Sequence, residues 1–266
     1  MSVSLYSKSQ DIEFKSWKFP VGEVGVQITG DIDPTELHFV KIKFQSNDDI
    51  FVALNLVDAL SRLGVAKRNI KLDIPYFPYS RQDRVCHAGE SFALKVAFDM
   101  LATAGVQIYT RDMHSNVFLD FAPIITNKAQ KYLCMGLPNY DLLVGPDAGS
   151  MNKVSSVAKQ YTTPYIALNK SRVGRSIEID VPITEDPIKG RVCIVDDLCD
   201  GGGTFIAAAN ALTATPGDVV ITRLDLYVTH GFFTAGIDKL KDVFDNIYCS
   251  VLYSEDQDTI NFVKVI

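Results

Sequence analysis

The chain has 266 residues, of which 47% are hydrophobic, and its formal net charge is −6 at pH 7. This length and composition can bury a large core, and we expect two domains, residues 1–130 and 131–266. The acidic balance argues against a nucleic-acid partner, because nucleic-acid binding needs a basic face.

Cysteine usage and the N-terminal sequence indicate the compartment. The five cysteines are scattered, odd in number and without a CxxC pair, so neither a disulfide framework nor a zinc site is suggested. The N-terminus lacks a signal pattern, and no apolar run approaches the roughly 18 residues that cross a bilayer. We therefore expect a cytoplasmic protein with no membrane partner.

The first half alternates between strand and helix patterns. The expected elements are a strand over 24–28 after a turn at 20–22, a strand over 38–44, a helix over 50–60, a strand over 70–74, a helix over 91–104 and a strand over 106–109. Such alternation is typical of α/β architecture with mainly parallel sheets.

Two stretches of this half carry polar side chains where a parallel sheet binds ligands. Prolines end the strand over 70–74, and the loop that follows reads PYFPYSRQDR. Its aromatic rings and guanidinium groups suit a base and its phosphates, although a solvated surface loop has the same composition. His114 follows the strand over 106–109, and only this position at a strand end favours a functional histidine over a structural one.

The second half repeats the plan. The expected elements are a strand over 141–144, a helix over 151–161, strands over 165–168 and 176–182, a strand over 192–195, a helix over 205–213, and strands over 219–228 and 247–253. Asp147 follows the first of these strands in the sequence GPDAGS. Lys170, Arg172 and Arg175 form a cationic cluster that suits phosphate, or else a solvated hairpin arm.

The stretch RVCIVDDLCDGGGTF, residues 191–205, is the most informative. A buried strand is followed by Asp196 and Asp197, a glycine turn and a helix, so helical N–H groups can meet a phosphate while the carboxylates hold sugar hydroxyls or Mg²⁺. The stretch lacks the lysine of the GxxxxGK[ST] loop, and an acidic pair has no place in GxGxxG. It resembles the phosphoribosyl-diphosphate motif; an ordinary strand-to-helix turn is the alternative.

Six motifs together extend the resemblance. FPxGE, PYFPYSRQDR, the aspartate-x-histidine at 112–114, GPDAGS, NKSR and VDDxxDGGGT stand in the order found in the ribose-phosphate diphosphokinases, or phosphoribosyl-diphosphate synthetases. The resemblance runs from about Phe19 to Ile266. It implies two phosphoribosyltransferase-like subdomains with mainly parallel sheets, the first on the ATP side and the second on the ribose-phosphate side. It also implies Mg²⁺-dependent transfer of the β,γ-diphosphate of ATP to the anomeric hydroxyl of ribose 5-phosphate, with release of AMP.

The resemblance also implies roles for individual residues. The ribose hydroxyls would be held by Asp196 and Asp197, and the 5-phosphate by Asp200, Gly201, Gly202, Gly203 and Thr204. His114 and Asp147 would bind Mg²⁺, and ATP would contact Arg81, Gln82 and Asp83. Phe19 and Glu23 of a neighbouring subunit would complete the ATP site, so we expect a homo-oligomer, at least a dimer. Lys170 and Arg172 would be catalytic and lie on a mobile loop.

Departures from the family pattern leave alternatives open. The family has a hydroxyl residue at the position of Gly201 and a polar residue at the position of Val21, and its opening strand-helix unit and closing helix are expected to be missing. Gly201 leaves room for an acceptor substituted on its 5-phosphate, such as ADP-ribose. A phosphoribosyltransferase and a non-catalytic regulatory subunit are the other hypotheses. The acceptor, the oligomeric state and allosteric control stay open.

Overall fold

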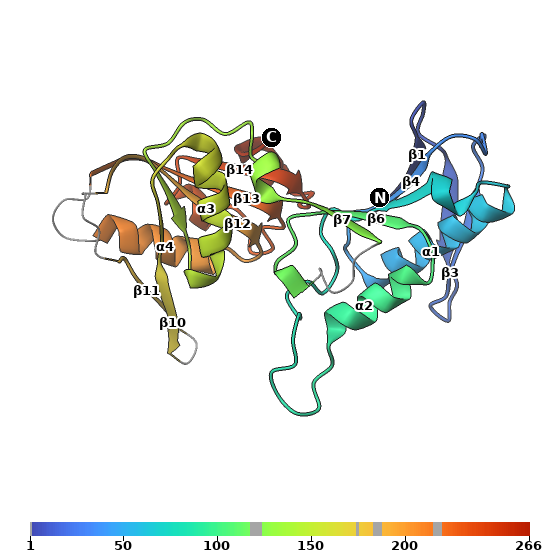
Figure 1. Ribbon diagram of the computed structural model, residues 1–266, viewed down its shortest axis with the longest axis horizontal. Coiled ribbons are helices and arrows are strands. Elements are labelled where there is room, and N and C mark those ends of the chain that lie inside the picture. The colour runs from blue at the N-terminus through green and yellow to red at the C-terminus, as the bar shows by residue number, and fades with distance from the viewer. Residues whose placement is uncertain (1, 118–123, 174–175, 183–187, 215–219) are drawn as a thin grey trace. The chain divides into compact units, whose positions relative to one another are not determined.

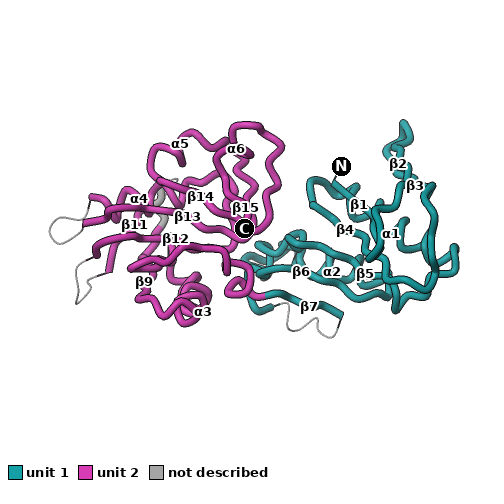
Figure 2. Tube along the Cα trace, turned by 90° about the horizontal axis from the view of Figure 1, so that it is seen from above, with its two compact units in different colours: residues 1–128 teal, residues 129–266 magenta. Residues whose placement is uncertain are grey.

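The computed structural model describes residues 2–117, 124–173, 176–182, 188–214 and 220–266. The chain divides into two compact units, Met1–Lys128 and Ala129–Ile266 (Figure 2). This division falls two residues before the expected boundary. None of the described helices is long and apolar enough to cross a membrane.

Unit 1 is built on a five-stranded sheet with the order β1-β4-β5-β6-β7 (Figure 1). Only β1 runs antiparallel to its neighbour, and the other four strands are parallel. The strands are β1 (Val3–Ser7), β4 (His38–Ile42), β5 (Ile70–Asp73), β6 (Gln107–Arg111) and β7 (Ile125–Lys128), and the helices are α1 (Asn47–Arg62) and α2 (Ala93–Ala102). Strand β1 therefore precedes the FPxGE segment, in the part of the chain from which an opening strand-helix unit was expected to be missing.

Helix α1 shows how the sequence sets these elements. Ser46 and Asp49 form a capping box at its N-terminus, which satisfies backbone N–H groups that the helix leaves unpaired. Ile50, Val57 and Leu60, which are seven and three residues apart, are buried on one face of the helix. The helix thus has a fixed start and one apolar side to pack against the sheet.

A separate hairpin packs on α1. It consists of β2 (Phe14–Lys18) and β3 (Val24–Ile28), which pair antiparallel, and Lys18 forms an ion pair with Asp48 of α1 at 2.6 Å. Strand β2 is exposed along most of its length, and its sequence lacks a buried face from which it could have been predicted. Phe19 and Glu23 lie at the turn, where the Phe19 N–H donates to the Glu23 carbonyl at 2.7 Å.

Unit 2 is built on a six-stranded parallel sheet with the order β15-β14-β13-β12-β8-β9. Its strands are β8 (Leu142–Gly145), β9 (Tyr165–Ala167), β12 (Lys189–Cys199), β13 (Val220–Gly231), β14 (Asn246–Leu252) and β15 (Val263–Val265). Its helices are α3 (Met151–Tyr161), α4 (Gly203–Ala214), α5 (Asp238–Lys241) and α6 (Gln257–Phe262). The antiparallel hairpin of β10 (Asn169–Val173) and β11 (Ser176–Asp180) projects from this unit (Figure 1).

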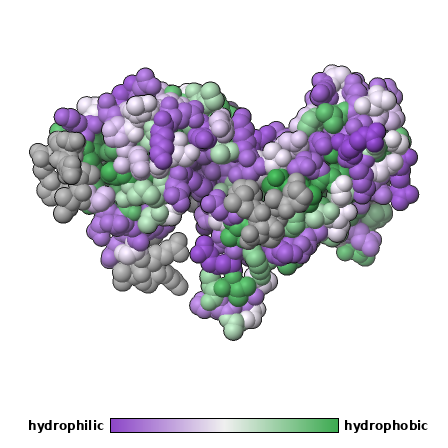
Figure 3. Space-filling view, in the orientation of Figure 1, coloured by the Kyte–Doolittle hydropathy of each residue, from purple (hydrophilic) through white to green (hydrophobic). Residues whose placement is uncertain are grey.

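Helices cover both faces of this sheet. Ile194 packs in a core cluster that includes Phe205 of α4, whereas its neighbours Cys193 and Val195 pack in a second cluster that includes Val154 of α3. Alternate residues of β12 therefore face opposite helices, as the period of two in a strand requires. The expected α/β class with mainly parallel sheets is confirmed. Hydrophilic residues cover much of both units on the face shown in Figure 3, with hydrophobic ones among them.

Candidate active site

Two neighbouring parallel strands of unit 2 carry the predicted acidic residues at or after their carboxyl ends. Asp147 follows β8, and Asp196 and Asp197 lie near the end of β12, which pairs with β8 on one side and β13 on the other. Ligands in open parallel sheets bind at the carboxyl ends of strands. The sheet therefore brings these three predicted residues to the edge where a ligand site is expected.

The acidic pair lies within β12, not after it. The apolar run predicts a strand that ends at Val195, but pairing with β13 continues it to Cys199. Because side chains alternate along a strand, Asp196 belongs to the face covered by α4 and Asp197 to the face covered by α3. The Asp197 N–H donates to Oδ1 of Asp196 at 2.9 Å. Burial first, and then the charge of Asp197, hold the pKa of Asp196 well above its usual range.

Two residues that the sequence analysis did not select hold this pair. Gln130 is buried, and its Nε2 donates to the Asp196 carbonyl at 2.6 Å and to Oγ1 of Thr229 at 3.4 Å. The Nζ of Lys153, on α3, lies 3.5 Å from Oδ2 of Asp197. Both contacts join segments far apart in the chain, so no local pattern could have revealed them. The sequence shows only that Lys153 lies beside the apolar face of the predicted helix, which does not by itself indicate a partner.

The glycine turn contains one glycine that the backbone requires and two that it does not. Gly202 has φ +80°, and a Cβ there would lie 3.1 Å from the side chain of Leu240. A Cβ at Gly201 would meet nothing closer than 3.8 Å, and one at Gly203 nothing within 4 Å. The backbone conformation therefore explains why residue 202 is glycine. At positions 201 and 203 the reason for glycine would be the close approach of a ligand to the backbone.

The turn leads directly into α4. The carbonyl of Gly202 accepts the N–H groups of Phe205 and Ile206 at 3.0 and 3.1 Å, so the helix begins one residue later, at Gly203. Asp200 fixes the other end of the turn, because Oγ1 of Thr234 donates to its Oδ1 at 2.7 Å. The first-turn N–H groups of α4 lie at a fixed helix N-terminus, a position that favours an anion.

Lys170 joins this turn to Asp147. Its Nζ donates to Oγ1 of Thr204, in the first turn of α4, at 3.1 Å and lies 3.6 Å from Oδ2 of Asp147. The Lys170 side chain is only 16% exposed. Three residues predicted from three separate motifs are thus in direct contact. The side chain of Arg172 lies outside the described part of the structure, as does Arg175.

Unit 1 brings together two other predicted positions. Asp83, in the loop between β5 and α2, is buried and accepts Nε of Arg84 at 2.9 Å and the side chain of Ser115. Burial raises the pKa of Asp83, but these hydrogen bonds and the nearby charge of His114 outweigh it and lower the pKa. The loop is therefore anchored to the segment that carries His114, which follows β6.

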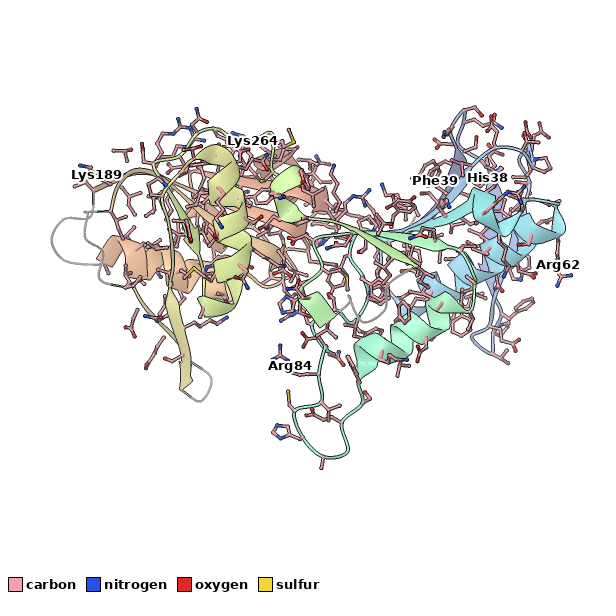
Figure 4. The ribbon with its side chains drawn as sticks, viewed as in Figure 1. His38, Phe39, Arg62, Arg84, Lys189 and Lys264 are labelled. Carbon is pink, nitrogen blue, oxygen red and sulfur yellow. The ribbon has the colours of Figure 1, made fainter. Side chains whose placement is uncertain are left out.

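The remaining predicted positions of unit 1 are exposed. Arg81 and Gln82 lie on the surface of the loop, from which Arg84 also extends (Figure 4). Phe19 is 47% exposed at the turn of the β2–β3 hairpin. Its ring is oriented edge-on to that of Trp17, with the ring centroids 6.2 Å apart. The hairpin and the loop lie on different sides of unit 1 in Figure 1. This arrangement leaves the expected contact of Phe19 and Glu23 with a neighbouring subunit as a prediction.

Comparisons with known proteins identify the family. Residues 2–105 match the family described as the N-terminal domain of ribose phosphate pyrophosphokinase. The chain is 30% identical over 245 residues to the ribose-phosphate pyrophosphokinase of Pyrococcus furiosus, an alignment that covers 89% of this chain and 84% of that protein. It is 28% identical over 267 residues to the enzyme of the same name from Pasteurella multocida, covering 94% and 82%.

The chain belongs to the ribose-phosphate pyrophosphokinase family. The resemblance inferred from the motifs is thereby confirmed, and with it the expectation of a transferase of this type. The fold agrees: phosphoribosylpyrophosphate synthetase from Mycobacterium smegmatis superposes with a TM-score of 0.76 at 22% identity, covering 96% of this chain and 86% of that one.

The donor groups of this ribose-phosphate pyrophosphokinase family member suit Mg²⁺. Among the described residues, no three histidine, cysteine, aspartate or glutamate side chains gather as a metal cluster. Mg²⁺ seldom needs such a cage, because it keeps several waters and is usually held by one or two carboxylates together with substrate phosphates. The Asp147 side chain is 35% exposed, and Lys170 links it to Thr204 at the end of the glycine turn. Asp147 therefore fits that description.

Proposed function

We propose that this protein transfers the β,γ-diphosphate of ATP to the anomeric hydroxyl of ribose 5-phosphate, giving phosphoribosyl diphosphate and AMP. The observation that carries the proposal is the contact of Lys170 with both Thr204 and Asp147. It places a cation between a helix N-terminus that suits the acceptor's phosphate and a carboxylate that suits a nucleotide-bound Mg²⁺.

The acceptor is held by the end of β12 and the turn after it. Asp196 and Asp197 accept hydrogen bonds from ribosyl hydroxyls, while residues 200–204 surround the phosphate with backbone N–H groups and the Thr204 hydroxyl. Charge-assisted hydrogen bonds of this kind are the stronger ones in proteins. They fix the sugar, so that its anomeric oxygen is held for attack on the β-phosphorus.

In the transfer step the anomeric hydroxyl releases its proton to water as its oxygen bonds to the β-phosphorus, and the bond from that phosphorus to the oxygen that leaves with AMP breaks. Lys170 neutralises charge on the phosphoryl oxygens, and Arg172 is assigned the same role from the resemblance. His114 and Asp147 would hold Mg²⁺, which supplies charge neutralisation at the phosphates. Arg81, Gln82 and Asp83 bind ATP.

We also propose a homo-oligomer that shares the ATP site. Phe19 and Glu23, at the exposed hairpin turn, would contact ATP bound to a neighbouring subunit. Mixing a Phe19→Ala variant with an Asp197→Asn variant is expected to restore part of the activity, because a hybrid dimer would retain one site with both residues intact. No recovery in mixtures of stably folded variants would contradict sharing.

The test of the activity is incubation with Mg-ATP and ribose 5-phosphate, followed by identification of the products by mass. AMP and phosphoribosyl diphosphate in equal amounts are expected, and EDTA should stop their formation. AMP formation without an added base also excludes a phosphoribosyltransferase. Tight Mg-ATP binding without turnover would instead support a regulatory subunit.

A second acceptor class is favoured by the room at Gly201. A Cβ at this position would find no atom closer than 3.8 Å, so the fold leaves space where the family has a hydroxyl side chain. An acceptor with a substituted 5-phosphate, such as ADP-ribose, would use that space. Assaying ADP-ribose beside ribose 5-phosphate decides between them, since a clear preference for ribose 5-phosphate rejects the substituted acceptor.

A further inference from the structure

We infer that Lys153 is a positioning residue, which holds the carboxylate of Asp197 in place for the acceptor's hydroxyls. The inference rests on the proposed ribosyl phosphate site. It concerns a residue that lies outside the six motifs and is supplied by the helix on the opposite face of the sheet from α4.

The contact itself is built into the interior of unit 2. Nζ of Lys153 is buried and lies 3.5 Å from Oδ2 of Asp197, whose side chain is 8% exposed. Burying an ammonium group is costly unless a negative charge stands beside it. The position of Lys153 is therefore explained by the acidic pair, and it would be unfavourable without it.

The pair needs such a cation. Two carboxylates on consecutive residues repel each other, and after burial the charge of Asp197 is the largest cause that raises the pKa of Asp196. Lys153 opposes this effect on Asp196 and contacts Asp197 directly. It thus holds the carboxylate of Asp197 at a fixed position, while the Gln130 side chain donates a hydrogen bond to the Asp196 carbonyl.

The chain order of the site supports the same role. Asp147 caps the short helical turn over 148–150, and α3 follows directly with Lys153 on its first turn. One segment therefore presents Asp147 toward Lys170 and Lys153 toward Asp197. Two aspartates from different strands are each matched by a lysine.

The experiment compares Lys153→Met, Lys153→Arg and the control Lys159→Met, which removes an exposed lysine from the same helix. We expect Lys153→Met to raise the KM for ribose 5-phosphate about tenfold or more while the KM for ATP stays within about twofold. Lys153→Arg should recover most of the loss, and Lys159→Met should change neither constant by more than about twofold. Equal KM values for wild type and folded Lys153→Met would overturn the inference.

Two further variants separate this inference from the proposed function and protect the test against misfolding. Asp197→Asn should raise the acceptor KM by itself; if it does not, the proposed role of the acidic pair is wrong. The double variant Lys153→Met/Asp197→Asn contains no unpaired buried charge at this contact. It should be no worse than Asp197→Asn alone, because Lys153 acts through Asp197. Additive losses in the double variant would show that Lys153 acts elsewhere.

Discussion

Replacing Lys170 by methionine tests the centre of the proposed site. Methionine keeps an unbranched apolar chain of similar length and removes the charge that lies 3.6 Å from Asp147 and 3.1 Å from Oγ1 of Thr204. At 3.6 Å, two unit charges interact by about 4.6 kcal/mol at an effective dielectric constant of about 20. That energy gives the scale on which the Lys170 charge interacts with a neighbouring charge at this site.

Only the interaction that strengthens as charge moves onto the phosphoryl oxygens accelerates transfer. Loss of one such donor commonly costs about 2.7–4 kcal/mol, so we expect kcat to fall about 100- to 1000-fold. The KM for ATP should change far less. Arg172→Ala should behave similarly if the resemblance assigns its role correctly.

The assay follows AMP release at saturating Mg-ATP and acceptor, with Lys159→Met as the matched control for loss of a lysine. A kcat for Lys170→Met within about threefold of wild type would refute the reasoning, because a charge in contact with the reacting groups cannot be that unimportant. A large rise in the KM for the acceptor at unchanged kcat would instead assign Lys170 to the phosphate turn.

Three other substitutions test separate parts of the structure. Gly202→Ala should lower the free energy of unfolding by about 1 kcal/mol or more because of its positive φ, whereas Gly201→Ala should leave stability unchanged and raise the acceptor KM; equal unfolding energies of the two variants would contradict this. Tyr140→Phe removes a 2.6 Å hydrogen bond to the fully buried Asp225 and should destabilise the fold by about 1.5–3 kcal/mol in urea titrations, with activity retained by the folded fraction. The pKa of Asp256 is lowered by its capping hydrogen bonds, so its carboxylate stabilises the fold above an unfolded pKa of about 3.9 and ceases to do so as pH falls through the lower folded value; the stability gap between wild type and Asp256→Asn should close as the pH falls below about 4, and a constant gap would be contrary.

Local patterns predicted most of the parallel sheet, since a strand buried on both faces is apolar along its whole length. They failed where pairing overrides composition. Asp196 to Cys199 continue β12 because Val228, His230 and Gly231 of β13 supply backbone partners, although aspartate disfavours strands. Strand β1 was not predicted, although its sequence VSLYS carries a usable signal. Val3 and Leu5 alternate with less buried residues, as expected of a strand with one buried face.

The candidate site could be predicted as a set of motifs but not as a set of contacts. Lys170 and Thr204 are 34 residues apart, and the fold alone brings them within 3.1 Å. Lys153 was missed because its partner Asp197 lies on another element, so its local sequence resembles that of any exposed helix residue. Motif order identifies a family, whereas the charge partners of a site depend on which strand ends the sheet places side by side.

Charge balance at this edge of the sheet gives an independent reason for a metal. Asp147 is matched by Lys170, and Asp197 by Lys153, so these two pairs contribute no net charge to attract an anion. Burial, and then the charge of Asp197, raise the pKa of Asp196. Besides Arg172, whose role is assigned from the resemblance, the phosphate dianion of the acceptor would then meet one helix N-terminus, which carries only about half a positive charge. A divalent ion bound to the nucleotide would supply the further positive charge that the transferred phosphoryl groups need.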